Sequence, residues 1–554
     1  MIPRQTSRFA RYGPVLPLVV IALSGCFPTR GSAQVTPVDD VLNEYVRVLQ
    51  VAGRADPGSL LIRPLRGWHS GALSDTVAHP WADLFLSRFE STRPSGFRLL
   101  HAGATLSNNT ALPVFQNDGA MWQGRGLNFA AVVGARFESG PLRMTVQPIF
   151  VRSQNRSFDL APVQREGQPA YAHPWLIIDI PQRMGSETYS LVHPGESTLE
   201  VVAGRVVAGV SSRNLWWGPG QRSSIIMSNH APGLLHAFFA TDGPVETAIG
   251  VLEAQWVWGR PSESGVYEDR GAGRGRFFTG LAVAWSPLAG LSFGVTRAVM
   301  AAWPDGGLGI GDVLQVFSSK SGFRRNLSTE ENPDADDPDL DQIASVSVRY
   351  VPGGGGFEVY AEYARNDSPW DFRDLLVEPE YTRAYLAGFM KVFPLSGGRL
   401  LALTGEVSSL EVTRHGQLVP TTSYYQNLGV PQGYTNHGQV LGSVFGVGGA
   451  GQHLSADLYD RGRRVRAFVE RRVVDNDYFF ETFSSERDKA GTADTPKFRH
   501  HVAWEAGVGV LLMRRNGLEV GVDLAMNRDL NRYYEYRNDV WNLHTLVEAR
   551  WRPR

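Results

Sequence analysis

The stretch Trp541-Asn542-Leu543-His544-Thr545-Leu546-Val547-Glu548-Ala549-Arg550-Trp551 decides the fold of this chain. Apolar residues alternate with polar ones along it, and successive side chains of a β-strand point to opposite faces. The stretch therefore predicts a strand with one apolar face and one polar face. Its 11 residues, with a tryptophan at each end, have the length and end residues of a strand tilted across a lipid bilayer.

The same alternation recurs along the chain, for example at Leu518–Met526, Phe357–Tyr363 and Val465–Val473. Strands of a soluble β-sandwich are usually about five or six residues long, whereas several of these runs reach about ten. A backbone in hydrocarbon must pair every amide internally, and no apolar run after the start is long enough for a membrane helix. The sequence therefore predicts an all-β fold, a transmembrane antiparallel β-barrel. About 460 residues follow the N-terminal region, which allows about 18 strands at roughly 25 residues per strand and loop.

Composition agrees with one large β unit. The chain has 554 residues, a formal net charge of -1 and 60 glycines. A soluble protein of this length would have about three or four domains, but no charge-rich linker divides the chain. The single cysteine excludes an internal disulfide, so we expect sheet closure to provide the stability.

The first residues resemble an export signal. A basic region, a short apolar region and a small-residue cleavage site follow one another at Arg4–Arg11, Pro14–Leu23 and Gly31–Ala33. The alternative is a lipoprotein signal, in which Cys26 is acylated and becomes the new N-terminus. Because a closed barrel needs no lipid anchor, cleavage after Ala33 is favoured. Either route predicts an exported protein, located in the cell outer membrane.

An N-terminal helical region precedes the strands. Apolar residues recur at helical spacing from Thr36, a suitable N-cap, to Gly53, which ends the helix. A second helix is predicted from about Pro80 to Glu90. Two short helices cannot form a domain alone, so they either plug or dock to the barrel or merely cover one end of it. We expect a signal peptide over 1–33, a periplasmic helical element over 34–93 and the barrel over 94–554.

The segment Arg213–Ala231 is the strongest candidate for a site. It contains Trp216 and Trp217, then Gly218-Pro219-Gly220, which forces a break and predicts the indoles at the mouth of a loop. Indole faces stack on sugar rings, and Arg, Asn and Gln bind hydroxyls and carboxylates, so the segment suits carbohydrate recognition. The alternative is that the tryptophans belong to an interfacial aromatic girdle and that the Gly-Pro-Gly is only a turn.

Other motifs indicate no cofactor and no metal site. The chain lacks a Walker loop, a Gly-x-Ser-x-Gly elbow and a His-Glu-x-x-His helix. The acidic run Glu330–Asp341 lacks the glycine and terminal Glu of a calcium loop, so a solvated loop is favoured. We expect the arginines of Arg461–Arg472 to meet lipopolysaccharide phosphates, lumenal carboxylates or an acidic glycan, because export argues against nucleic acid.

Five segments with distinctive motifs follow one another along the chain: Asn117–Asn128, Ile178–Gly185, Arg213–Ala231, Glu362–Asp367 and Gln432–Gly442. Together they resemble motifs of the capsule assembly Wzi family, and the helix near Tyr45 followed by Ile62-Arg63-Pro64-Leu65 resembles the start of that family. The resemblance implies an outer-membrane barrel of 18 strands with a periplasmic helical bundle. It also implies a lectin that tethers capsular polysaccharide or exopolysaccharide to the cell surface without catalysis.

Three functions remain open at this point: a polysaccharide lectin, a porin-like diffusion channel, and a barrel hydrolase that uses His437 or Asp179. We expect a monomer whose partners are polysaccharide, outer-membrane lipid and lipopolysaccharide. The candidate residues for polysaccharide binding, or alternatively for structuring the lumen by hydrogen bonds, are Trp216, Trp217, Arg222, Asn229, His230, Tyr434 and His437. Glycan contacts instead lie on external loops around Ser318–Asp341 or Phe480–Thr495 if those residues only structure the lumen.

Overall fold

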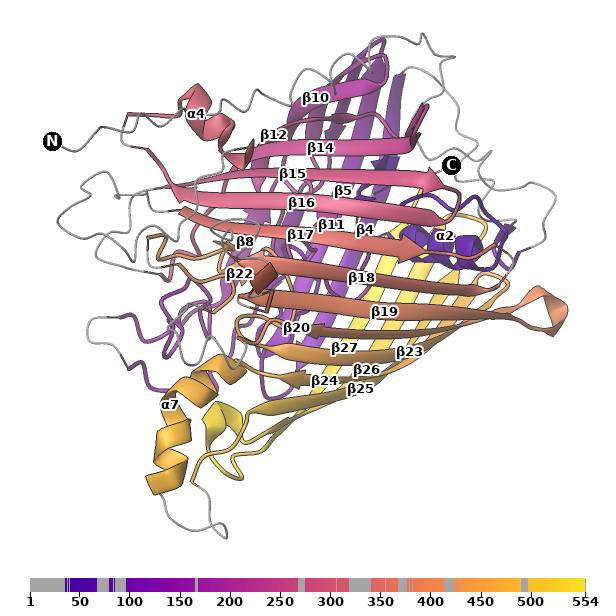
Figure 1. Ribbon diagram of the computed structural model, residues 1–554. Coiled ribbons are helices and arrows are strands. Elements are labelled where there is room, and N and C mark those ends of the chain that lie inside the picture. Colours follow the sequence, from indigo (N-terminus) through magenta and orange to yellow (C-terminus); the bar gives the residue numbers. More distant parts are fainter. Residues whose placement is uncertain are drawn as a thin grey trace, which may run out of the picture.

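The computed structural model forms a closed antiparallel barrel with helices and loops at its two ends (Figure 1). It describes residues 35–36, 38, 40–66, 79–82, 84, 96–164, 168–267, 275–304, 306–317, 340–353, 355–366, 376–377, 379–380, 382–412, 423–427, 429–489 and 497–553. The signal peptide, Cys26, the acidic residues Glu330–Asp339 and most of the helix expected over Pro80–Glu90 lie outside these residues.

The wall of the barrel consists of strands joined in sequence order. They are β4 (Gly96–Asn109), β5 (Gly126–Ser139), β6 (Leu142–Val146), β7 (Ile149–Ser153), β8 (Tyr189–His193), β9 (Thr198–Ala203), β10 (Val206–Ser211), β12 (Leu235–Thr241), β13 (Val245–Thr247), β14 (Gly250–Arg260), β15 (Arg276–Leu288), β16 (Leu291–Ala302), β17 (Leu340–Tyr350), β18 (Phe357–Asn366), β19 (Arg383–Pro394), β20 (Leu400–Ser409), β23 (Ala450–Asp460), β24 (Arg463–Val473), β25 (Val502–Met513), β26 (Leu518–Leu530) and β27 (Val540–Trp551).

Short elements lie inside the barrel or at its ends. The short strands are β1 (Val35–Thr36), β2 (Ile62–Arg63), β3 (Leu65–Arg66), β11 (Trp216–Trp217), β21 (Thr435–Asn436) and β22 (Gln439–Val440). The helices and single 3-10 turns are α2 (Val41–Val51), α4 (Ile310–Val313), η2 (Gln315–Phe317), η5 (Ser396–Gly398), α7 (Asn476–Lys489) and η6 (Arg532–Tyr534).

The sheet closes on itself with 18 strands, as the sequence predicts. Three of these strands each consist of two segments. Segments β6 and β7 both pair with β5, and segments β8 and β9 pair with β7 and β6, respectively. Segments β12 and β13 both pair with β14. Pairing of β27 with β4 completes the ring. The described wall therefore has no free sheet edge, which is the arrangement that hydrocarbon requires.

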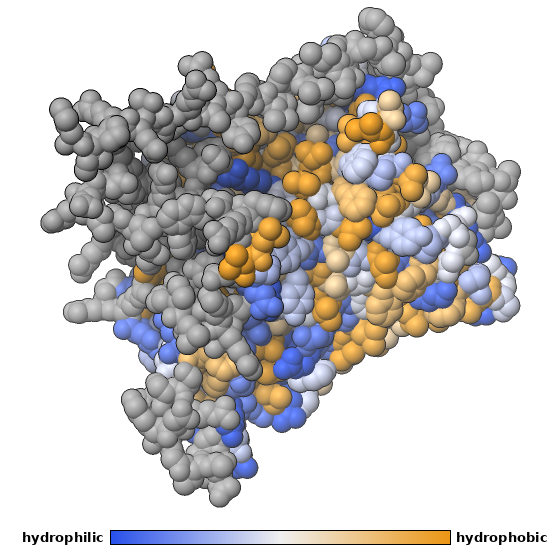
Figure 2. Space-filling model, viewed as in Figure 1, coloured by the Kyte–Doolittle hydropathy of each residue, from blue (hydrophilic) through white to orange (hydrophobic). Residues whose placement is uncertain are grey.

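The polarity of the wall is the reverse of that of a soluble protein. On β26, Val522 and Leu524 are 49% and 46% exposed on the outside, whereas Glu519 and Asn527 are 2% and 3% exposed on the inside. Figure 2 shows hydrophobic side chains over much of the visible outer wall. The alternation read in the sequence is therefore confirmed, with the apolar face toward lipid and the polar face toward the lumen.

The two ends of the barrel differ. One end, here called the short-turn end, carries tight turns such as Asp460–Arg463 together with α2 and the described C-terminus (Figure 1). The opposite, long-loop end carries the longer connections 110–125, 154–188, 212–234 and 410–449, and also α7. Bacterial barrels have short periplasmic turns and longer extracellular loops, so we expect the short-turn end to face the periplasm.

The helix α2 confirms the predicted N-terminal helical region but begins later than expected. Its N-cap is Asp40, whose carboxylate accepts the amide hydrogen of Leu42 at 3.0 Å, so the expected N-cap at Thr36 is wrong. The predicted end is correct. Gly53 has a φ of +68°, and the amides of Gly53 and Arg54 donate back to the carbonyl groups of the last turn. Among the described residues, no helix has the length and apolar character needed to cross a membrane.

Side chains of α2 fill the short-turn end of the lumen. Tyr45 stacks on Trp81 with ring centroids 4.1 Å apart, and both side chains are fully buried. Arg47 donates two hydrogen bonds, of 3.0 and 2.6 Å, to the carboxylate of Glu358 on the lumenal face of β18. A second buried guanidinium, that of Arg349, donates to the same carboxylate at 2.6 Å. The helix therefore occupies the mouth of the barrel and does not stand apart from it.

Two arginines of β24 join the helix to the wall. Arg464 and Arg466 both form ion pairs with Glu44 of α2, and Arg466 also contacts Asp457 at 2.6 Å. Three kinds of partner were expected for the arginines of this strand. Arg464 and Arg466 have one of them, lumenal carboxylates. Burial and the two guanidinium groups act in opposite directions on Glu44, and the guanidinium groups lower the pKa of this carboxyl to about 2.

The lipid-facing assignment predicts a depth-dependent cost of charge on one strand. We expect Leu524→Arg to lower the free energy of unfolding by about 2–4 kcal/mol, and Leu518→Arg, on the same face near the short-turn rim, by about 0–1 kcal/mol. Urea titration of the protein folded into lipid vesicles measures both. Equal, small costs for the two variants would contradict a membrane-spanning wall.

Candidate functional site

The Trp-Trp segment lies in the interior of the barrel, where it meets the N-terminal chain. Strand β11 pairs with β2 in an antiparallel register that sets Trp216 opposite Arg63 and Trp217 opposite Ile62. The amide of Gly218 donates to the carbonyl of Leu61 at 2.8 Å and extends this pairing. A loop from the long-loop end and a segment that follows α2 at the short-turn end therefore join inside the lumen. We call the two segments together, 60–63 and 212–234, the lumenal plug.

Both indoles of the plug are buried. Trp217 is fully buried, its Nε1 donates to Gln255 Oε1 at 2.8 Å, and a Cβ added at Gly280 would lie only 2.7 Å from its ring. Trp216 is 3% exposed, and the guanidinium of Arg63 lies 4.5 Å from the centroid of its ring. The indoles directly precede the Gly-Pro-Gly turn, as expected, but the alternative of an aromatic girdle is wrong, because pairing with β2 holds both rings in the lumen.

A carboxylate from the wall fixes the turn after the indoles. Glu406 on β20 accepts hydrogen bonds from the backbone amides of Gln221, Arg222 and Ser223 at 2.7, 3.2 and 2.7 Å. It also accepts the hydroxyl hydrogen of Tyr360 at 2.8 Å. The Gly-Pro-Gly break that the sequence predicts is thus a turn whose amides point at a buried negative charge.

Ion pairs continue this arrangement toward β24. The guanidinium of Arg222 contacts the carboxylate of Glu470 at 2.5 and 3.1 Å, and His453 Nδ1 lies 3.0 Å from the same carboxylate. Glu470 is almost fully buried, so removal of its partner would leave a charge without compensation. Arg222 is therefore held by the wall of the barrel, although one side of it borders a cavity.

A second loop, 410–449, covers the plug from the long-loop end. Tyr425 and Tyr434 stack with centroids 5.7 Å apart, and both rings are fully buried in the lumenal hydrophobic cluster that contains Trp217. The hydroxyl of Tyr425 donates to the carbonyl of Ile225 at 2.6 Å. Gln439 donates to the carbonyl of His230 at 2.8 Å. The two loops therefore form one packed unit inside the barrel.

The Asn-His pair and His437 belong to the same unit. Asn229 Nδ2 donates to the carbonyl of Asn117 at 2.6 Å, and the ring of His230 stacks on Phe115 with centroids 5.6 Å apart. Burial lowers the pKa of His230 to about 3 and that of His437 to about 4, so both rings are neutral at pH 7. The structure thus brings all seven candidate residues onto the plug and the loop that covers it.

The two residues considered for hydrolysis hold a neighbouring segment. The carboxylate of Asp179 accepts the amide hydrogen of Ser264 at 2.8 Å, and the amide of His437 donates to the carbonyl of Ser262 at 2.8 Å. Asp179 is 1% exposed. Both contacts fix the chain between Ser262 and Ser264, which is a packing role.

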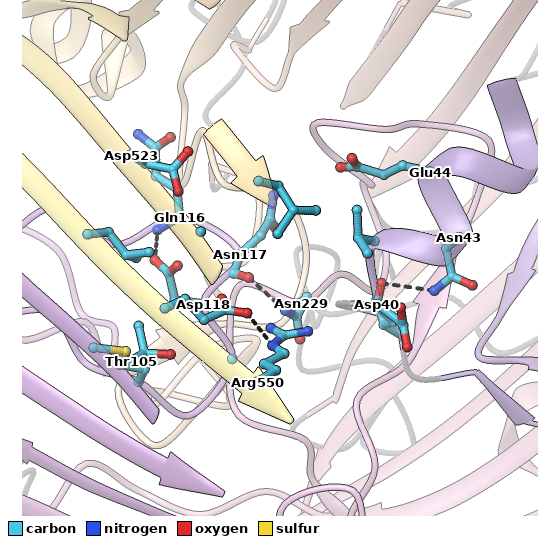
Figure 3. A pocket seen from close by; sticks show the side chains of 18 of the residues that line it. Asp40, Asn43, Glu44, Thr105, Gln116, Asn117, Asp118, Asn229, Asp523 and Arg550 are labelled. Carbon is cyan, nitrogen blue, oxygen red and sulfur yellow. Dashed lines mark hydrogen bonds and ion pairs between the residues drawn. The ribbon is translucent and has the colours of Figure 1, made fainter. Parts of the chain in front are cut away.

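A cavity of about 560 Å³ separates α2 from the inward-folded loops. Figure 3 shows its polar lining, with Asp40, Asn43 and Glu44 on the helix side, Gln116, Asn117 and Asp118 on the loop side, and Asp523 and Arg550 from the wall. Of the seven candidate residues, Trp216, Arg222 and Asn229 border it. Burial raises the pKa of Asp118 to about 6. Sequence reasoning missed this cavity, because its lining comes from many strands that only the closed sheet brings together.

A second feature missed by sequence reasoning lies at the long-loop end, in the connection between β26 and β27. Four of its non-glycine residues, Asn531, Tyr533, Tyr534 and Arg537, have positive φ angles between 51° and 65°. Tyr534 is fully buried and donates to the carbonyl of Asp475 at 2.8 Å. Such backbone conformations persist only where the surroundings fix them, and they concentrate at functional sites.

The same connection presents aromatic and basic groups to solvent. Tyr536 is 43% exposed, and the guanidinium of Arg537 lies 5.2 Å from the centroid of its ring. Tyr533 donates to the carbonyl of Asp159 at 2.9 Å and so ties the connection to the loop 154–188. The run Tyr533-Tyr534-Glu535-Tyr536-Arg537 is the sequence signal that could have found this surface.

A packed aromatic cluster supports this surface from below. Tyr534 packs with Tyr478 and Phe479 of α7, and the ring of Trp175 stacks on that of Tyr478 at 4.7 Å. Burial, together with the nearby Asp477, raises the pKa of Asp475 at the start of α7 to about 7. Two loops were suggested for glycan contacts. One of them, Phe480–Thr495, is helical up to Lys489, where α7 ends. The other, Ser318–Asp341, is described by the structure only from Leu340 onward.

These features define a class of protein. An apolar outer wall, a closed sheet and a polar lumen filled by the chain itself are the properties of an outer-membrane β-barrel with an internal plug. The sequence profile described as "Capsule assembly protein Wzi" matches residues 110–550. The chain therefore belongs to the capsule assembly Wzi family.

One solved structure supports the same fold. The outer-membrane protein Wzi of Escherichia coli, described as a carbohydrate-binding β-barrel involved in group 1 capsule assembly, is 12% identical, with a TM-score of 0.60 over 92% of this chain and 98% of that chain. OccK9 (OpdG) of Pseudomonas aeruginosa is 12% identical, with a TM-score of 0.40 over 82% of this chain and 98% of that one. OccAB3 of Acinetobacter baumannii is 10% identical, with a TM-score of 0.39 over 81% and 98%. No curated protein matches the sequence.

Burial of the indoles predicts that they stabilise the barrel. We expect Trp217→Ala to lower the free energy of unfolding by about 3–5 kcal/mol, because it empties a packed site in the lumen. Urea titration monitored by circular dichroism measures the loss, with the exposed Trp541→Ala as the matched control of small effect. Unchanged stability of Trp217→Ala would contradict the assignment of this indole to the packed plug.

Proposed function

We propose that this protein tethers capsular polysaccharide or exopolysaccharide to the cell surface and carries out no catalysis. Membership of the capsule assembly Wzi family supports a role in capsule assembly. The E. coli protein of similar fold is described as carbohydrate-binding, and the proposal extends that property to this chain. The observation that carries it is the lumenal plug, because a barrel closed by its own chain acts on a polymer at its surface.

We place the polymer contact on the long-loop end. This end is extracellular by the ordinary orientation of bacterial barrels, and polymer retained on the cell lies outside. The exposed ring of Tyr536 and the guanidinium of Arg537 provide a stacking face and a planar donor group for hydroxyls and carboxylates. The fixed backbone between Asn531 and Arg537 holds them in place before binding, which lowers the entropy cost of recognition.

The seven residues singled out in the sequence take the other role considered for them, that of structuring the lumen. Five of them, Trp216, Trp217, Asn229, His230 and Tyr434, are at most 8% exposed, so little of their surface is open to a polymer. Arg222 is neutralised by Glu470. In this proposal they act on polysaccharide only indirectly, because they hold the loops from which the outer surface is built.

A diffusion channel is the second candidate, and the polar cavity beneath the plug favours it. The cavity borders Trp216, Arg222 and Asn229 on the side of the plug, so solutes would have to pass between tightly packed residues. We therefore expect low conductance of the purified protein in planar bilayers. Steady conductance comparable to that of an open porin would favour the channel over the lectin.

Binding of polysaccharide by the purified barrel tests the proposal. We expect the host's surface polysaccharide to bind the native protein, and Tyr536→Ala and Arg537→Ala each to weaken binding by about tenfold, on the scale of a single charge-assisted or stacking contact. Biolayer interferometry with immobilised polymer measures the affinity. Arg514→Ala, an exposed arginine in the turn at the opposite end, serves as the control and should bind as the native protein does.

Two outcomes would contradict the proposal. One is the absence of binding by the folded native protein, and the other is equal weakening by Arg514→Ala. In cells, deletion of the gene should leave polymer synthesis unchanged and shed polymer into the medium. An unchanged amount of cell-bound polymer in the deletion strain would contradict the proposed tethering function.

A further inference from the structure

The outer wall carries a row of arginine and tryptophan residues at the long-loop end. Register pairs Arg471 of β24 with Trp504 of β25, Trp504 with Arg528 of β26, and Arg528 with Trp541 of β27. Cross-strand partners lie at the same level and point to the same side of a sheet. We call these four residues the Arg-Trp row. Nothing in the sequence pattern of a single strand reveals it, because each strand contributes one residue.

The row faces away from the lumen. Trp504 and Trp541 are 45% and 57% exposed, and the side chain of Arg528 is 44% exposed. Each residue lies on the face of its strand that also carries the exposed apolar side chains, for example Val469 on β24 and Met526 on β26. The opposite faces of the same strands carry the buried Glu470 and Asn527. The row therefore belongs to the lipid-facing side of the barrel.

The row also marks a boundary along the barrel axis. The next outward-facing level toward the middle of the strands is wholly apolar, and its register partners are Leu454, Val469, Ala506, Met526 and Leu543. The level after that contains Ala456, Ala467, Val508, Leu524 and Thr545. The Arg-Trp row is thus the first level outward from this belt that carries charged side chains, with Val473, Val502 and Leu530 beyond it at the strand ends. Arginine and tryptophan at the edge of an apolar belt are typical of the level of the lipid headgroups.

The two arginines retain positive charge at this level. Arg471 donates to the neutral amide oxygen of Gln452 at 2.9 Å, and Gln452 is its register partner on β23. The guanidinium of Arg528 lies 4.9 Å from the ring centroid of Trp541 and 3.1 Å from the exposed carboxylate of Asp539. Among these direct contacts there is a single carboxylate, that of Asp539 beside Arg528, for the two guanidinium groups of the row. Their strands are two apart, about 10 Å, so each guanidinium has room for an anionic group of its own.

We infer that the Arg-Trp row binds the phosphate groups of lipopolysaccharide in the outer leaflet. A guanidinium matches a phosphate through two parallel hydrogen bonds, and it is more weakly hydrated than an ammonium group, which suits a headgroup region. The neighbouring indoles lie at the depth where tryptophan is stable, between acyl chains and headgroups. The row fixes the depth of the barrel in the leaflet and is separate from the polysaccharide contact at Tyr536 and Arg537.

Binding of diphosphoryl lipid A to the full-length folded barrel in detergent tests this inference. We expect the double variant Arg471→Gln/Arg528→Gln to lose about tenfold or more in affinity, because each charge-assisted hydrogen bond contributes well above a neutral one. Native mass spectrometry of the protein with added lipid measures the bound fraction. Circular dichroism and the urea midpoint show whether each variant is folded.

Arg463→Gln is the matched control, because Arg463 lies on the same outward face of the same strand at the short-turn end, with its side chain 58% exposed. It should bind diphosphoryl lipid A within about twofold of the native protein, since one exposed charge far from the leaflet has little effect. Dephosphorylated lipid A should bind the native protein as weakly as diphosphoryl lipid A binds the double variant. Equal affinity of the native protein and the folded double variant would overturn the inference. Phosphatidylglycerol bound as tightly as diphosphoryl lipid A would also overturn it, since any anionic lipid would then suffice.

Discussion

Pairing of backbone amides in hydrocarbon is the constraint on which the rest of this structure depends. A sheet in lipid has no water to satisfy an open edge, so β27 must return to β4 and the ring must close. Closure then sets the two faces of every strand. Apolar side chains such as Val522 and Leu524 face outward, and the polar side chains between them are enclosed in the lumen.

The enclosed polar groups explain why the interior is filled by the chain itself. Glu358, Glu406 and Glu470 point into the lumen, where an ionised group without a partner would be costly. Arg47 of α2 and Arg222 of the loop 212–234 pair with Glu358 and Glu470, and backbone amides of the same loop donate hydrogen bonds to Glu406. The Trp-Trp-Gly-Pro-Gly segment therefore has a physical reason for its composition. It combines bulk that fills space with a turn that aims amides at a carboxylate.

The sequence predicts the wall better than the interior. Alternation with period two is a local property, so the strands, their polarity and their approximate number can be predicted from the sequence alone. The start of α2 was misplaced because Thr36 and Asp40 are both suitable caps, and only the hydrogen bond to Leu42 decides between them. Pairing of Trp216 with Arg63 joins residues far apart in the chain, and no local pattern predicts it. The cavity, the Arg-Trp row and the surface at Tyr536 likewise arise from strands brought together by closure.

In this account, the wall of the barrel spans the membrane, the plug closes the lumen, and the long-loop surface is the proposed contact with the outside. Hydrogen exchange of the purified protein, followed by mass spectrometry, tests its central claim that the segment 213–231 is a packed plug. The amides of Trp217 and Gly218, bonded to the carbonyl groups of Met227 and Leu61, should exchange as slowly as those of the barrel strands. Exchange of this segment within seconds, as in an exposed loop, would contradict the account.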